Sequence, residues 1–180
     1  MVTGHGTDHR SHEIALGREP RYFTVFRDPA PLMVSRYNFF LARQQTEVPF
    51  EEWYPTLKPN WAHRRMRLMM GASNYPDLQQ KLRDFWFVGI TEHLNEDLPH
   101  IFGEMGLPTE WKNRRVAGAG VDMSDVDTKT LPGERFAVER KLTLTDEIRE
   151  RVEADNQKDV RLYEFAKELR QEMIERHGWS

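Results

Sequence analysis

Apolar residues in this chain form two short uninterrupted runs and several spaced stripes. The first run, residues 22–26 (Tyr-Phe-Thr-Val-Phe), is β-branched and aromatic without alternation, which predicts a strand buried on both faces. The second run, residues 85–91 (Phe-Trp-Phe-Val-Gly-Ile-Thr), has the same character and predicts a second strand. Since continuous apolar strands are typical of parallel sheets covered by helices, we expect both inside the protein.

A helix is predicted directly after the first strand. Asp28 is a favourable N-cap residue, Pro29 suits the first helical position, and the helix should run to about Gln44. Its apolar stripe consists of Met33, Tyr37, Phe40 and Leu41.

Most of the remaining chain is predicted to be helical. By apolar spacing and capping residues, the predicted helices are 61–70, 77–83, 92–105, 145–156 and 160–177. Gly71 and Gly106 should end the first and third of these helices, and Thr145 should cap the fourth. Proline or glycine residues indicate loops over 47–59, which also holds a short helix, and over 112–141. The last helix should bury Leu162, Phe165, Ala166, Leu169 and Met173.

The order strand, helix, strand, helix, followed by further helices, predicts an α/β fold with a mainly parallel sheet. A length of 180 residues suits one domain, and we expect residues 1–180 to form one.

Composition narrows the function classes. The chain has no cysteine, which excludes a disulfide scaffold, a thiolate nucleophile and cysteine-ligated zinc. With 26 Lys+Arg against 29 Asp+Glu the net charge is −3, so we expect no general nucleic-acid binding. No apolar stretch approaches the ~18 residues of a membrane span, and no signal-peptide pattern opens the chain. We therefore expect a cytoplasmic protein without a transmembrane segment.

The turn between the first strand and its helix is the best candidate for chemistry. Ligands of open α/β sheets gather beyond the carboxyl ends of the strands, where a helix start offers N–H groups to an anion. Arg27 ends the strand, and Ser35 lies two helical turns past Asp28 on the same face. A guanidinium and a hydroxyl suit a phosphate. On the residues alone, the alternative is favoured, in which Arg27 pairs with Asp28 or another acid and Ser35 only packs.

The residues around this turn also resemble a known family. Residues 22–29 (Tyr-Phe-Thr-Val-Phe-Arg-Asp-Pro), continuing to Ser35-Arg36-Tyr37, resemble the 3′-phosphate-binding motif of sulfotransferases that use 3′-phosphoadenosine 5′-phosphosulfate (PAPS). The similarity is closest to the branch that includes the carbohydrate 2-O-sulfotransferases. Other stretches that agree with this branch are Gly4-His5, residues 87–92 (Phe-Val-Gly-Ile-Thr-Glu), and Asn156, Asp159, Leu162-Tyr163 and Phe165-Ala166.

The resemblance implies a fold and a set of roles. The fold would be a three-layer α/β arrangement with a mainly parallel sheet of the P-loop nucleotide-binding type. Arg27 and Ser35 would hold the 3′-phosphate of PAPS, Thr91 would lie near the adenine, and His5 would be the general base. The reaction would be sulfonyl transfer to a hydroxyl of a small molecule or, more in keeping with the branch, a carbohydrate, with no metal required.

The sequence also departs from the family. The P-loop pattern Gly-x4-Gly-Lys followed by Ser or Thr does not occur, and neither does a Lys-x-Gly-Thr-Thr variant. The chain therefore matches the family only after its first strand–loop–helix unit, and we expect nucleotide binding without transfer. We favour the C-terminal part of a longer sulfotransferase over a natural short protein that binds nucleotide weakly or not at all. A sheet lacking its first strand should have an open edge that favours self-association.

Two hypotheses from other classes stay open. One is a non-catalytic domain that binds a nucleotide or a protein partner. The other is a helical nucleic-acid-binding module around Arg64–Arg67, a basic cluster near Trp61 that also suits an anionic acceptor or a solvated helix face. A metal cluster of His5, His9, His12, Asp8 and Glu13 is not expected, because the spacings do not fit the His-Glu-x-x-His pattern.

Overall fold

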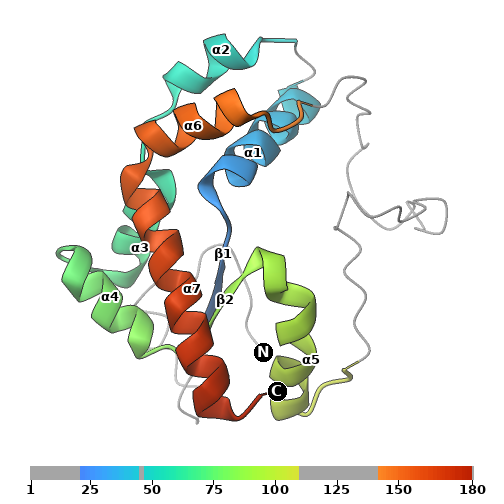
Figure 1. The fold of residues 1–180 in the computed structure, drawn as a ribbon, viewed down its shortest axis with the longest axis vertical. Helices are drawn as coiled ribbons and strands as arrows, with labels where there is room; N and C mark the ends of the chain where they lie inside the picture. Colours follow the sequence, from blue (N-terminus) through green and yellow to red (C-terminus); the bar gives the residue numbers. More distant parts are fainter. Residues whose placement is uncertain (1–20, 45–46, 110–141, 180) are drawn as a thin grey trace.

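The computed structural model describes residues 21–44, 47–109 and 142–179. In chain order, its elements are β1 Phe23–Phe26, α1 Pro29–Gln44, α2 Phe50–Trp53, η2 Tyr54–Thr56, α3 Trp61–Met70, α4 Tyr75–Arg83, β2 Phe87–Ile90, η3 Thr91–His93, α5 Leu94–Glu104, α6 Asp146–Asp155 and α7 Gln157–His177, where η marks a 3₁₀ turn (Figure 1). The predictions for His5 and for the loop over 112–141 lie outside these residues. Helices dominate, and the α/β class is confirmed.

The two strands pair in parallel, as predicted. The register runs from Phe23 opposite Phe87 to Phe26 opposite Ile90. Within the described residues, the sheet consists of these two strands. A three-layer fold of the P-loop type requires a sheet with more strands.

Burial of the two strands differs from the prediction. All four residues of β2 are buried, as expected. In β1 only Phe26 is buried, so the prediction of a strand buried on both faces was wrong there. The physical reason is the position of α7, which packs along β2 and covers its outer edge, where the amide of Val88 donates to Met173 Sδ at 3.1 Å.

The start of α1 follows its sequence. The Asp28 carboxylate accepts a hydrogen bond from the Ala30 amide at 3.0 Å, which is N-capping geometry. The predicted stripe packs against α2 and α6; of its members Met33, Tyr37 and Leu41 are buried, whereas Phe40 is only partly so. Trp53 and Tyr54 in the 47–59 segment complete this cluster, so the predicted loop with a short helix is confirmed.

The predicted bounds of α3 are confirmed, and two other helices start earlier than predicted. Gly71 ends α3 in the left-handed conformation, with φ of 59°. The helix α4 begins at Tyr75, because the Asn74 side chain accepts from the Asp77 amide at 2.9 Å and acts as the cap. The helix α7 begins at Gln157, directly after α6 and three residues before the predicted start.

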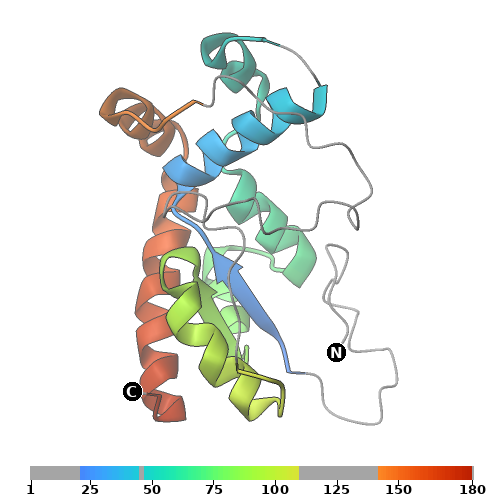
Figure 2. The ribbon, with the colours of Figure 1, turned by 90° about the vertical axis from the view of Figure 1, so that its right-hand side faces the viewer.

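The longest helix, α7, holds the main core together. Its predicted stripe is buried and shares one apolar cluster with the strands and α5; the stripe is Leu162, Phe165, Ala166, Leu169 and Met173. Figures 1 and 2 show α7 running along the length of the strand pair, with α5 beside it. In the described residues, no helix combines the length and apolarity needed to cross a membrane.

Candidate functional site

The carboxyl ends of β1 and β2 bring two predicted site residues together. Since Phe26 is paired with Ile90, Arg27 and Thr91 are the next residues along the two strands. The Thr91 hydroxyl donates to the Phe26 carbonyl at 3.0 Å and ties the strand ends together. Its oxygen can still accept a hydrogen bond, and the residue is exposed. The juxtaposition of Arg27 and Thr91 therefore follows from the parallel register.

The half-buried Arg27 does not pair with Asp28. The Asp28 carboxylate is bound instead to the Ala30 amide and, at 2.9 Å, to Nη1 of Arg149 in α6. Among the residues that the structure describes, the Arg27 side chain has neither a hydrogen bond nor an ion pair. The alternative in which Asp28 neutralises Arg27 is therefore wrong, and this strand-end residue has no carboxylate partner among the described residues.

The start of α1 supplies fewer anion-binding groups than the sequence suggested. Pro29 and Pro31 have no N–H, and the amide of Ala30 between them is bound to Asp28. The next amide, of Leu32, donates to the Asp28 carbonyl at 3.0 Å. The first helical turn therefore has no free amide for an anion, and the expectation of such N–H groups was wrong. Binding at this edge must depend on side chains.

Of the other two predicted site residues, the structure describes only Ser35. Ser35 lies seven residues along α1 from Asp28, which is about 10 Å at the helical rise. It is half-buried, and no hydrogen bond joins it to Arg27 within the described residues. It shares a helix face with Phe39, whose side chain is 65% exposed. His5 lies outside the described residues.

Sequence reasoning gave no site role to four further polar residues near this edge, Tyr163, Glu92, Arg149 and Glu153. The Tyr163 hydroxyl of α7 forms a hydrogen bond with Glu92. Its pKa is raised mainly by burial, and further by this hydrogen bond and the negative charges of Glu92 and Asp28. Arg149 also binds Glu153 at 3.0 Å, one helical turn further along α6. Hydrogen bonds to Asp28 and Glu153 raise the pKa of the Arg149 guanidinium, which therefore stays charged. The edge thus carries charges of both signs, with Arg27 as a cation that no described acid neutralises.

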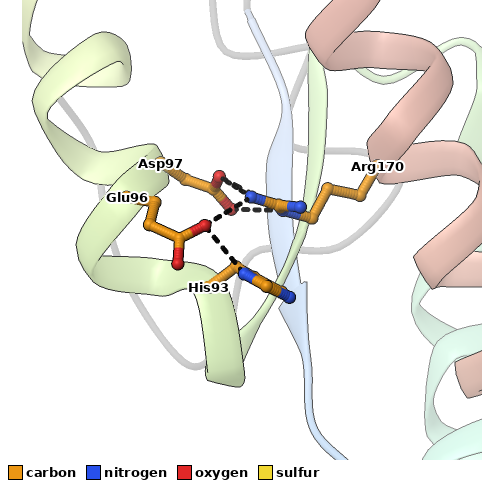
Figure 3. A network of polar contacts seen from close by, with 4 residues as sticks. All are labelled: His93, Glu96, Asp97 and Arg170. Carbon is orange, nitrogen blue, oxygen red and sulfur yellow. Dashed lines mark hydrogen bonds and ion pairs between the residues drawn. The ribbon is translucent and has the colours of Figure 1, made fainter. Parts of the chain in front are cut away.

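A second polar network lies between α5 and α7 (Figure 3). Arg170 donates to both carboxylate oxygens of Asp97, with its Nη2 at 2.6 Å and its Nε at 3.1 Å from Oδ1, and Nε at 3.0 Å from Oδ2. Asp97 is 2% exposed, so this ion pair is buried. Glu96 extends it outward to His93 at 2.8 Å. Its place between two helices of the core makes it a structural element.

Glycine at position 89 lies close to the Phe87 ring and beside this ion pair. A Cβ built there would lie 3.1 Å from Phe87 Cε1 and 3.4 Å from Asp97 Oδ2. Any side chain at position 89 would therefore crowd the Phe87 ring and come into contact with the carboxylate. The requirement explains a glycine inside a buried strand, where it otherwise weakens the structure.

Two residues of the resemblance have structural partners. The Asp159 carboxylate accepts from the amides of His63 at 2.8 Å and Ala62 at 3.1 Å, and so caps α3. Asn156 accepts from the Asn60 amide at 2.7 Å and donates to the Tyr54 hydroxyl at 2.9 Å. Both are buried near the junction of α6 and α7, and burial raises the pKa of Asp159. They fix the helices around the sheet rather than contribute to its edge.

The basic cluster on α3 is partly used inside the protein. Arg67 donates to the carbonyls of Ala72 and Ser73 and fastens the end of the helix. The Trp61 ring contacts two guanidinium groups, those of Arg36 at 4.3 Å and Arg65 at 5.6 Å from its centroid. These contacts give the cluster a structural role, so the nucleic-acid hypothesis gains no support from it.

The buried His63 predicts a pH dependence of stability. Burial first, then the charges of Arg67 and Lys158, lowers the pKa of its imidazole below 6.5. The unfolded chain then takes up a proton before the folded one, so the stabilisation is complete above pH 6.5 and is lost as the pH falls toward the folded pKa. We expect the free energy of unfolding to fall less between pH 7 and pH 5 in His63→Leu than in the wild type, as measured by urea unfolding. Equal slopes would contradict this assignment.

No described group of three or more His, Asp or Glu side chains is arranged to hold a metal ion. No protein-family model, curated protein or solved structure matches this chain.

Proposed function

We propose that this chain is a sulfotransferase-family domain that binds the 3′-phosphate of PAPS at the carboxyl edge of its strand pair. The observation that carries the proposal is Arg27, a strand-end guanidinium whose neighbouring carboxylate is taken up by Arg149. A guanidinium binds phosphate oxygens through paired N–H groups, and such charge-assisted bonds are the strong ones.

The neighbouring groups are consistent with a nucleotide at this edge. Thr91 is exposed and follows β2 as Arg27 follows β1. Its hydroxyl would therefore lie close to a ligand held by Arg27. Ser35 stays in the proposal as a second phosphate contact from α1, and His5 as the base toward the acceptor. The first helical turn of α1 adds no amides, so most of the phosphate affinity should reside in Arg27.

The finer fold and the chemistry belong to the same proposal. The strand pair would be part of a three-layer, P-loop-type sheet. The group transferred would be the sulfonyl group of PAPS, passed to a hydroxyl of a small molecule or carbohydrate, without a metal. The chain contains no P-loop pattern for the 5′-phosphosulfate, so binding and transfer need separate measurements.

Calorimetric titration of the folded chain with adenosine 3′,5′-bisphosphate tests the binding step. Saturable binding with one site is the expected result. A parallel assay with PAPS and a mixture of carbohydrate hydroxyl acceptors measures transfer. Binding without transfer would favour the non-catalytic alternative, and a folded sample that binds no nucleotide would contradict the proposal. Salt-sensitive binding of DNA or RNA would instead favour a nucleic-acid module.

A further inference from the structure

The ion pair between Arg149 of α6 and Asp28 at the start of α1 bears on anion binding, if the site binds a phosphate as proposed above. Arg149 Nη1 lies 2.9 Å from Asp28 Oδ2, and the two side chains are 37% and 21% exposed. The Asp28 carboxylate adjoins Arg27 in the chain and sits over the first turn of α1. Without Arg149 it would be a bare negative charge beside the position of the phosphate.

We propose that Arg149 is a positioning residue for anion recognition, which screens and holds the Asp28 carboxylate so that the Arg27 guanidinium remains available to a phosphate. Asp28 has two oxygens and two described partners: Oδ1 takes the Ala30 amide, and Oδ2 takes Arg149. With Oδ2 bound in this way, the carboxylate does not turn toward Arg27.

Charge arithmetic supports this role. A phosphomonoester carries about −1.5 to −2 charges at pH 7, and the described acids Asp28, Glu92 and Glu153 lie around the same edge. Their described cationic neighbours are Arg27 and Arg149. Removing the charge of Arg149 would leave Arg27 as the one described cation against these three acids. Binding of the negatively charged phosphate would then be strongly disfavoured. Arg149 is placed to act through Asp28, since its partners among the described residues, Asp28 and Glu153, are both carboxylates.

A double-mutant cycle with adenosine 3′,5′-bisphosphate tests the inference. Arg149→Gln should weaken binding about fivefold, the upper end for a partly exposed charge pair. In an Asp28→Asn background the same substitution should change affinity by less than about twofold, because there is no carboxylate left to screen. Asparagine caps helices as well as aspartate, so that background keeps the start of α1. Arg149→Lys, which keeps the charge, should bind nearly as the wild type does.

Arg151→Gln is the matched control. It removes the same charge from the same helix, but its guanidinium lies over the Tyr54 ring, 5.1 Å from the centroid. Its affinity should equal that of the wild type, and thermal unfolding should show each variant folded. An equal loss for Arg149→Gln in both backgrounds would mean that Arg149 touches the ligand and would overturn the inference, as would no loss in either. Absence of binding by the folded wild type would instead overturn the proposed function, and this inference with it.

Discussion

Replacement of Arg170 by methionine is expected to lower the free energy of unfolding by about 3–5 kcal/mol. Methionine keeps much of the apolar contact of the side chain but leaves the Asp97 carboxylate, 2% exposed, without its counter-charge. An uncompensated buried charge is costly because the interior cannot solvate it. Urea unfolding at pH 7, followed by circular dichroism, measures the loss.

The same helix offers a control for this prediction. Lys167 forms an ion pair with Glu164 at 2.6 Å, but both side chains are exposed, so Lys167→Met should cost less than about 1 kcal/mol. The double variant Asp97→Leu with Arg170→Met removes both charges and should be more stable than Arg170→Met alone. A loss below 1 kcal/mol for Arg170→Met would show that the ion pair does not hold α5 to α7.

The second large effect concerns ligand binding rather than folding. Arg27→Ala should weaken the binding of adenosine 3′,5′-bisphosphate by about 1.5–3 kcal/mol, which is roughly tenfold to more than a hundredfold. In the proposed site, Arg27 would donate the charged hydrogen bonds to the phosphate, and α1 has no free amide in its first turn to replace them. Isothermal titration calorimetry on the folded variant measures the change.

Arg83→Ala is the control for this variant. Arg83 ends α4, which leads into the amino end of β2, opposite to the proposed site, and its guanidinium lies over the Phe165 ring. Its loss should leave nucleotide affinity unchanged. If Arg83→Ala weakened binding as much as Arg27→Ala does, the ligand would be responding to overall charge rather than to a site at the strand ends.

Much of the fold could be predicted because local patterns determine it. The apolar runs predicted both strands. Asp28 and Pro29 predicted the start of α1, and Gly71 predicted the end of α3. The errors came from tertiary context. The burial of β1 was overestimated because α7 covers β2 instead. The start of α4 was misplaced because Asn74, not a later residue, caps it.

The candidate site was predictable only where register suffices. Parallel pairing alone places Arg27 beside Thr91 at one edge. The pairing of Asp28 with Arg149 joins residues 121 positions apart, and that of Asp97 with Arg170 joins residues 73 apart. Nothing in the sequence around each of these charges identifies its partner, and no local spacing relates them. Identifying such pairs requires the packing of the helices.

The most direct test of the 3′-phosphate site compares two nucleotides on two proteins. Adenosine 3′,5′-bisphosphate and adenosine 5′-phosphate differ only in the group that Arg27 is proposed to hold. For the wild type, we predict that removing the 3′-phosphate weakens binding by roughly tenfold or more, the scale of a charged hydrogen bond. For Arg27→Ala, the two nucleotides should bind with nearly equal affinity. The same penalty in both proteins, measured by calorimetry, would place the 3′-phosphate elsewhere and contradict the account.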